Sequence, residues 1–218
     1  MEIVNINDNK LILFEATNHN IINNKYIMDI LVEKQLDSAI IYKNIHENIY
    51  NIYILERDGS YSTMCGNGCI ALCRKLKHNI KLVNSENDTV FVEYNINNII
   101  LNLHVKMINN NTYLIGGEPH KIYFVDRYEV NYHKKIGREN IPQYNTTFIT
   151  KEKNKYIYST FERGVNEITS SCGTGSFGAI HYINNILKKN ISKIFTLDNK
   201  IYKFIYDNSQ YKLIFYNG

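Results

Sequence analysis

The chain has 218 residues, with 25 lysines and arginines, 21 aspartates and glutamates and 44% hydrophobic residues, a balance typical of one large globular domain or two small ones. Its net charge of +4 includes no dense basic run, which argues against nucleic-acid binding. The sequence opens without a charged leader and contains no apolar run near the ~20 residues of a membrane span. We therefore expect no membrane association and a cytoplasmic location.

Short apolar or β-branched runs, separated by Asn, Asp and Gly, recur along the whole chain and predict strands. The predicted strands cover residues 10–14, 38–42, 49–55, 89–93, 99–105, 121–125, 146–149, 156–161 and 200–206. Residues 68–77 and 175–188 have apolar residues at helical spacing instead. Each predicted helix begins directly after a glycine-rich tetrapeptide.

These two helix starts are copies of one pattern. Met64–Ala71 reads Met-Cys-Gly-Asn-Gly-Cys-Ile-Ala, and Ser171–Gly178 reads Ser-Cys-Gly-Thr-Gly-Ser-Phe-Gly. Each copy lies near the middle of one half of the chain. The repeat predicts an α+β fold of two pseudo-symmetric domains, residues 1–110 and 111–218, each a curved, mostly antiparallel sheet or barrel around a central helix. The active site is then expected in the cleft between the two domains.

A cysteine at a helix N-terminus places a thiol beside an anion site. The unpaired N–H groups and partial positive charge there bind a carboxylate and are expected to lower the thiol pKa. If two such turns face each other, a substrate carboxylate lies between the helix ends, and one thiol lies on each face of its α-carbon. The pattern thus predicts Cys65 and Cys172 as a catalytic pair that removes and returns an α-proton without a cofactor.

The other two cysteines predict buried thiols. Cys69 and Cys73 follow Cys65 at intervals of four residues on one helical face, a spacing that matches no common zinc or iron–sulfur motif. No metal site is expected. In a reducing compartment all four cysteines should be free thiols.

The segments around the two motifs resemble the diaminopimelate epimerase family. They are Arg57-Asp58-Gly59-Ser60 before the first motif, Gly117-Glu118-Pro119-His120 between the motifs, and Glu162-Arg163-Gly164-Val165 before the second. The resemblance implies Cys65 and Cys172 as the catalytic pair and the backbone of Gly66, Asn67, Gly173 and Thr174 as the carboxylate cradle. It further implies Glu162 as the acid that holds the substrate α-ammonium, Arg163 at the distal end of the pocket, and Asn145 as a substrate contact.

Several positions depart from the family pattern. Glu56 and Glu118 stand where the family usually has asparagines in the distal part of the pocket. Ser38 stands where the family has a pocket glutamine, and Asn9 is the surviving candidate for a missing N-terminal Gly-Asn-Asp-Phe pattern. The second motif carries one extra residue between Glu162 and Cys172, and the chain stops about where the family adds one more strand.

The two extra carboxylates predict a cationic substrate side chain, because they should repel a distal carboxylate. Histidine, lysine, ornithine, arginine or a shorter diamino acid would fit, with histidine first because the family includes histidine racemases. Arg163 leaves two alternatives open: it binds a distal carboxylate of the substrate, or it pairs with Glu56 or Glu118.

Four other functions remain open. The four alternatives are a diaminopimelate epimerase, an isomerase of the phenazine-biosynthesis type, a protein that binds an amino acid without turnover, and a thiol redox sensor. The phenazine-type enzymes use a carboxylate rather than a cysteine pair, so Cys65 and Cys172 count against that alternative. The expected partner is a small amino acid, and the resemblance makes a homodimer reasonable.

Overall fold

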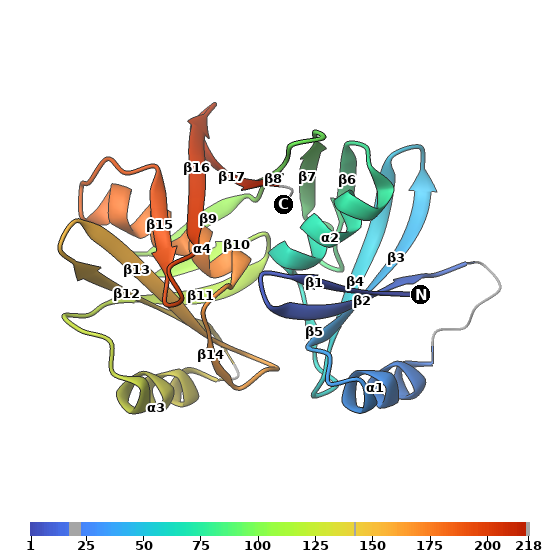
Figure 1. Cartoon of the computed structure of the whole chain (residues 1–218), viewed down its shortest axis with the longest axis horizontal. Coiled ribbons are helices and arrows are strands. Elements are labelled where there is room, and N and C mark those ends of the chain that lie inside the picture. Colours follow the sequence, from blue (N-terminus) through green and yellow to red (C-terminus); the bar gives the residue numbers. More distant parts are fainter. Residues whose placement is uncertain (18–22, 142, 217–218) are drawn as a thin grey trace.

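The computed structural model describes residues 1–17, 23–141 and 143–216, which form two lobes side by side, each with a helix enclosed by strands (Figure 1). The first lobe contains these elements: β1 (Glu2–Ile6), β2 (Asn9–Glu15), α1 (Asn24–Glu33), β3 (Ser38–His46), β4 (Ile49–Glu56), β5 (Tyr61–Ser62), α2 (Gly66–Leu76), β6 (Ile80–Val83), β7 (Thr89–Tyr94) and β8 (Asn98–Asn102).

β9 (Val105–Asn109) leads from the first lobe to the second, which repeats the order of the first. The second lobe contains these elements: β10 (Thr112–Ile115), β11 (Glu118–Phe124), α3 (Val130–Asn140), β12 (Asn145–Glu152), β13 (Lys155–Glu162), β14 (Glu167–Thr169), α4 (Gly173–His181) with a π-helical turn (Tyr182–Ile186), β15 (Lys193–Thr196), β16 (Ile201–Asp207) and β17 (Gln210–Tyr216).

Strand pairing shows that the two lobes are copies of one topology. In the first lobe β2 is parallel to β3 and β4 is parallel to β6, whereas β3–β4, β6–β7 and β7–β8 are antiparallel. In the second lobe the matching pairs β11–β12 and β13–β15 are parallel, and β12–β13, β15–β16 and β16–β17 are antiparallel. The predicted α+β fold with two pseudo-symmetric halves is confirmed.

The last strands of the two lobes join them. β8 runs antiparallel to β17, with Leu101 opposite Leu213, and both leucines are buried. One apolar core cluster therefore continues from one half of the chain into the other. We propose the division at residue 110 that the repeat predicts, with β9 crossing toward β10, its antiparallel partner.

The four helices have two different environments. α2 is enclosed by its sheet, with every residue from Gly66 to Cys73 buried, and α4 is buried from Gly173 to Ile180. The prediction that Cys69 and Cys73 are buried thiols is confirmed. α1 lies outside the sheet, where Ile27 and Leu31 pack on the outer face of β3 and β4.

Sequence patterns missed parts of this fold. Residues 99–105 were predicted as one strand, but the strand ends at Asn102 and β9 begins at Val105. The helices α1 and α3 were not predicted, because each has only two buried residues, Ile27 and Leu31 in α1 and His133 and Gly137 in α3. Two buried positions are too few to produce a clear helical stripe.

Candidate active site

Both motif cysteines occupy the N-cap position of an enclosed helix. The Sγ of Cys65 accepts the backbone N–H of Gly68 at 3.3 Å, and the Sγ of Cys172 accepts that of Gly175 at 3.4 Å. Each cysteine has extended backbone angles, as an N-cap requires, so the side chain turns back over the first helical turn. The local sequence therefore places the two thiols in equivalent positions.

The two helix N-termini meet at the centre of the molecule. A Cβ built on Gly66 would lie 3.2 Å from the Cα of Gly173, and one built on Gly173 would lie 3.1 Å from the Cα of Gly66. Only glycine lets two backbones approach so closely. The partial positive charges of α2 and α4 consequently point at the same place.

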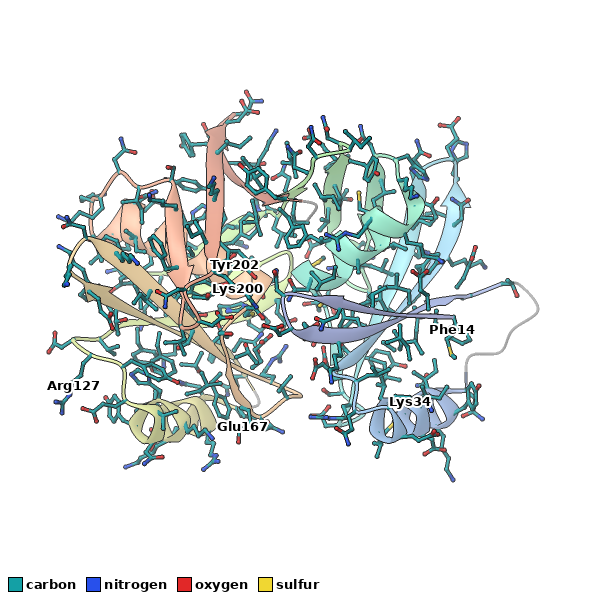
Figure 2. All side chains as sticks on the ribbon, viewed as in Figure 1. Phe14, Lys34, Arg127, Glu167, Lys200 and Tyr202 are labelled. Atoms are coloured by element: carbon teal, nitrogen blue, oxygen red, sulfur yellow. The ribbon has the colours of Figure 1, made fainter. Side chains whose placement is uncertain are left out.

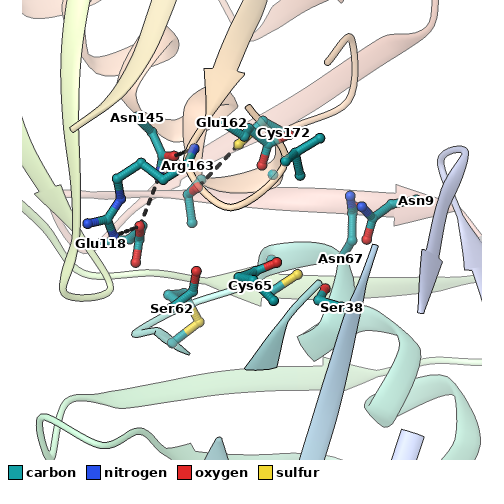
Figure 3. A pocket seen from close by; sticks show the side chains of 16 residues that line it. Asn9, Ser38, Ser62, Cys65, Asn67, Glu118, Asn145, Glu162, Arg163 and Cys172 are labelled. Carbon is teal, nitrogen blue, oxygen red and sulfur yellow. Dashed lines mark hydrogen bonds and ion pairs between the residues drawn. The ribbon is translucent and has the colours of Figure 1, made fainter. Parts of the chain in front are cut away.

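All twelve site residues predicted from the sequence line one pocket at this junction (Figure 3). Its walls come from both lobes, with Cys65 and Cys172 approaching from opposite sides (Figure 3). The lining consists of Asn9, Ser38, Glu56, Ser62, Met64, Cys65, Gly66, Asn67, Glu118, Asn145, Glu162, Arg163, Val165, Cys172, Gly173 and Thr174.

A polar network ties the two motifs together beside the pocket. The Asn67 side chain donates to the carbonyl of Ser171 at 3.1 Å, and the Tyr202 hydroxyl donates to the same carbonyl at 3.1 Å. The side chain of Asn7, in the turn between β1 and β2, donates to Tyr202 at 2.8 Å and to Asn67 at 3.3 Å. These bonds fix the second motif relative to the first.

Two carboxylates occupy equivalent positions in the two lobes. Glu56 ends β4 and Glu162 ends β13, nine and ten residues before their cysteines. Each is held by a hydroxyl from the next strand, Ser62 for Glu56 and Thr169 for Glu162. Ser62 and Thr169 pair with equivalent residues of β4 and β13, so the pseudo-symmetry extends to the hydrogen bonds.

Burial shifts the ionisation of both acids. Desolvation raises the pKa of Glu56 to about 8, opposed by the hydrogen bond from Ser62 and assisted by the charges of Glu162 and Glu118. The pKa of Glu162 is also raised, again by burial first. Glu56 makes no ion pair among the described residues. The pocket is therefore short of positive charge.

Arg163 pairs with Glu118, which decides between the alternatives left open by the sequence. The Glu118 carboxylate is 1% exposed and also accepts hydrogen bonds from Asn145 and Thr63 (Figure 3 shows the first of these). Its charge is thus already compensated. The expectation that Glu118 attracts a cationic side chain is wrong, and Glu56 alone remains for that role.

The expected low thiol pKa is also wrong for the unliganded pocket. Burial raises the pKa of Cys65 and of Cys172 well above the ordinary value, and the charges of Glu56 and Glu162 add to this effect. The N–H groups of Gly68 and Gly175 act in the opposite direction but are weaker. Desolvation of a buried anion outweighs one helix end. Burial therefore favours the protonated form of both thiols before a ligand binds.

His120 lies behind the pocket wall. Its ring nitrogens bond to Thr174 at 2.9 Å and to Thr147 at 3.2 Å, and Thr174 in turn lies 3.4 Å from the Sγ of Cys172. Burial and the nearby Arg163 lower the pKa of His120 to about 3, so the ring is neutral. A neutral imidazole in this place orients Thr174 and adds no charge.

Sequence reasoning missed part of the lining. Ser62, Met64 and Val165 reach the pocket, and Thr63 bonds to Glu118 from the same segment. Their positions beside Cys65 and Glu162 were the available signal. Within the described ranges, no three His, Cys, Asp or Glu side chains lie close enough to hold a metal ion. In the same part of the chain, no helix is long and apolar enough to cross a membrane.

Known proteins share this fold. No family model matches the chain. In solved structures, a predicted epimerase from Pseudomonas aeruginosa matches with a TM-score of 0.68 at 7% identity, over 98% of this chain and 93% of that one. A PhzF-family phenazine biosynthesis protein from Enterococcus faecalis matches with a TM-score of 0.65 at 9% identity, over 95% and 89%. At these identities the likeness concerns the fold alone.

Curated relatives are similar in sequence as well. The diaminopimelate epimerase of Flavobacterium psychrophilum is 28% identical over 195 residues, 78% of this chain and 72% of that protein. The diaminopimelate epimerase of Campylobacter lari is 27% identical over 180 residues, 74% and 70% of the two chains. The chain is therefore a homologue of the diaminopimelate epimerases, as its paired Cys-Gly-x-Gly motifs and the segments around them predicted.

Proposed function

We propose that this chain is a cofactor-independent amino-acid racemase or epimerase in which Cys65 and Cys172 act on opposite faces of the α-carbon. Its curated relatives bear the name of an epimerase, which places the chain among the isomerases. One observation carries the proposal: two thiols cap two helices from opposite lobes, and the helix ends are in backbone contact between them.

The proposed reaction uses only groups of this pocket. The substrate carboxylate lies between the N-termini of α2 and α4, and its α-ammonium lies at Glu162. One cysteine, as thiolate, takes the α-proton, and the electron pair of the C–H bond moves into the carboxylate, where helix N–H groups stabilise the charge. The other thiol then gives its proton to the opposite face. The α-carbon is inverted, and the two cysteines have exchanged protonation states.

A cationic ligand also promotes formation of the thiolate. The pKa of both thiols is raised in the unliganded pocket, first by burial and then by the nearby Glu56 and Glu162. An ammonium group at either carboxylate cancels that repulsion and lowers the thiol pKa. Substrate binding and activation of the base are thus coupled, which limits thiolate chemistry to the occupied site.

The charge balance of the pocket favours a basic amino acid. Arg163 compensates Glu118, the α-ammonium compensates Glu162, and a second cation would stabilise the ionised form of Glu56 in place of its proton. The Oδ1 of Asn9 is buried and has no hydrogen-bond partner among the described residues, so it offers a further acceptor. Histidine, lysine, ornithine, arginine and shorter diamino acids all supply a second cation, and histidine is the first candidate.

The test is α-deuterium incorporation in D₂O, followed by mass spectrometry with the reduced protein. The panel contains these basic amino acids and, because of the names of the relatives, meso-diaminopimelate. We expect exchange with at least one basic amino acid. In Cys65→Ser and Cys172→Ser we expect its rate to fall by about 10²-fold or more, the usual scale of general acid–base catalysis.

Cys73→Ser is the matched control, because Cys73 is buried in α2 outside the pocket and donates to the carbonyl of His78. Exchange that survives both pocket substitutions would refute the two-thiol mechanism. Exchange with diaminopimelate alone would be consistent with the two-thiol mechanism but would refute the proposal that the substrate has a basic side chain. No exchange with any compound, together with binding of an amino acid, would leave a binding protein as the function.

A further inference from the structure

The carboxylate of Glu118, the first residue of β11, is surrounded by hydrogen-bond donors. Its Oε1 accepts from the Asn145 side chain at 2.9 Å and pairs with the Arg163 guanidinium. Its Oε2 accepts from the backbone N–H of Thr63 at 3.1 Å and from the Thr63 hydroxyl at 2.8 Å. Each oxygen thus has two donors, and the side chain of Glu118 is 1% exposed.

These donors are the kind that bind a ligand carboxylate. A guanidinium supplies charge, while an amide, a hydroxyl and a backbone N–H supply direction. The donors come from different parts of the fold: Thr63 precedes Cys65 in the first lobe, whereas Asn145 and Arg163 belong to the second. The Oδ1 of Asn145 also accepts the backbone N–H of Arg163 at 2.7 Å, which holds the two donors in place.

The filled carboxylate site lies inside the reaction pocket. Glu118, Asn145 and Arg163 line the same cavity as Cys65 and Cys172, and Figure 3 shows the Glu118–Arg163 pair at one side of it. A substrate held at its α-carbon between the two cysteines would extend its side chain through this cavity. A second carboxylate on that side chain would compete with Glu118 for the Arg163 guanidinium.

We propose that Glu118 is a built-in carboxylate that fills a second carboxylate site of the pocket and thereby restricts the protein to amino acids with a single carboxylate. This inference rests on the proposed function for the orientation of the substrate. It makes Glu118 a specificity residue that acts by occupying the donors of Arg163, Asn145 and Thr63.

Displacement of Glu118 by a ligand is unfavourable for two reasons. Glu118 is tethered beside its donors and therefore competes at a high effective concentration. If it were displaced, a buried carboxylate would lose its ion pair with Arg163 in a pocket that already contains Glu56 and Glu162. Breaking a buried ion pair on one side strongly destabilises the protein.

The experiment compares two ligands that differ only by the distal carboxylate, lysine and meso-diaminopimelate. Their dissociation constants are measured by isothermal titration calorimetry for the native protein, Glu118→Ala and Glu118→Asn. We expect the preference for lysine over diaminopimelate to change by at least about tenfold towards diaminopimelate in both variants. In the double variant Glu118→Ala/Arg163→Met that gain should be lost.

Acetate provides a second, independent measurement. Acetate should raise the melting temperature of Glu118→Ala in a concentration-dependent manner by refilling the vacated donors. Glu56→Ala should not respond, because Glu56 makes no ion pair among the described residues. If Glu118→Ala does not fold, as judged by circular dichroism, the dissociation constants of lysine and diaminopimelate are compared for Glu118→Asn alone. The ligand preference is read from binding, so it tests the proposal even if no amino acid undergoes α-exchange.

Two results would overturn the proposal. The native protein could bind diaminopimelate as tightly as lysine, which would show that Glu118 excludes nothing. Alternatively, folded Glu118 variants could show no gain for diaminopimelate and no response to acetate, which would show that the donors do not form a carboxylate site. Failure of the proposed function would be seen separately, as absence of α-deuterium exchange in the native protein.

Discussion

At the scale of single residues, burial decides the charge state of the site. A helix N-terminus lowers the pKa of an exposed thiol, but Cys65 and Cys172 are enclosed and each lies near a carboxylate. The same burial raises the pKa of Glu56 and Glu162. In the unliganded pocket, burial therefore favours the protonated form of these groups, and a bound cation acts in the opposite direction.

Glu56 should make the stability of the protein depend on pH. Its pKa rises from 4.5 unfolded to about 8 folded, so between these values the unfolded chain binds fewer protons and stability falls as the pH rises. Below about pH 4.5 both states are protonated, and above about 8 the loss is complete. The loss is on the order of 5 kcal/mol, because the pKa change of about 3.5 units corresponds to about 1.4 kcal/mol per unit.

Glu56→Gln removes this titration. We expect the variant to gain stability relative to the native protein as the pH increases from 5 to 8, measured by urea unfolding at several pH values. Glu152→Gln, which replaces an exposed glutamate, is the control and should run parallel to the native protein. Parallel curves for Glu56→Gln as well would show that the pKa of Glu56 is not raised by folding.

At the scale of elements, the contact between the N-termini of α2 and α4 sets the distance between the two thiols. Backbone meets backbone there, at Gly66 and Gly173, so no side chain can adjust to an added methyl group. Because of the pseudo-symmetry, the two equivalent helix ends bring equivalent thiols and equivalent N–H groups to the carboxylate of the proposed substrate.

Gly66→Ala should therefore impair the reaction more than it impairs folding. The new Cβ would separate the helix ends by a few tenths of an ångström, and we expect α-exchange to fall by about 10²-fold, because small displacements at a reacting centre have large effects. Gly178→Ala is the control, because Gly178 lies in α4 away from the pocket. Its added Cβ would meet the side chains of Ile122 and Ile115. Its stability should decrease while exchange changes only a few-fold. Equal losses of exchange in the two variants would contradict this explanation.

At the scale of the whole molecule, the lobes share one core. The β8–β17 pairing continues the sheets across the junction, and the core cluster includes residues from both halves. The turn between β1 and β2 adds polar links, because Asp8 pairs with Lys200 and Asn7 bonds to Tyr202. Figure 2 shows Lys200 and Tyr202 where the two lobes meet.

We expect the two lobes to unfold in one cooperative transition, because neither can lose its structure without exposing the shared core. Differential scanning calorimetry should show a single peak. Leu101→Ala, which removes a fully buried side chain opposite Leu213, should lower the stability by about 2–5 kcal/mol and keep a single peak. Two separate transitions, in the native protein or the variant, would show that the lobes are independent.

The sequence by itself determined the repeated motifs, the cysteines at helix N-termini and most of the pocket residues, although not Ser62, Met64 and Val165. N-capping and glycine-dependent contacts depend on a few neighbouring residues, so a short segment such as Cys65-Gly66-Asn67-Gly68 is sufficient to predict them. Most strands were predictable for the same reason. The helices α1 and α3 were not, because their few buried positions give no periodic signal.

Only the tertiary structure decided the electrostatics of the site. Whether Arg163 pairs with Glu56, with Glu118 or with a substrate depends on how β11, β12 and β13 are aligned. In the structure Arg163 pairs with Glu118, so Glu118 is not the cation-binding residue that the sequence predicted. The direction of the thiol pKa shift could not be predicted from the sequence either, because desolvation depends on the folded pocket rather than on the motif. Local structure depends mainly on neighbouring residues in the sequence, whereas the charge state of a group depends on all the atoms that surround it after folding.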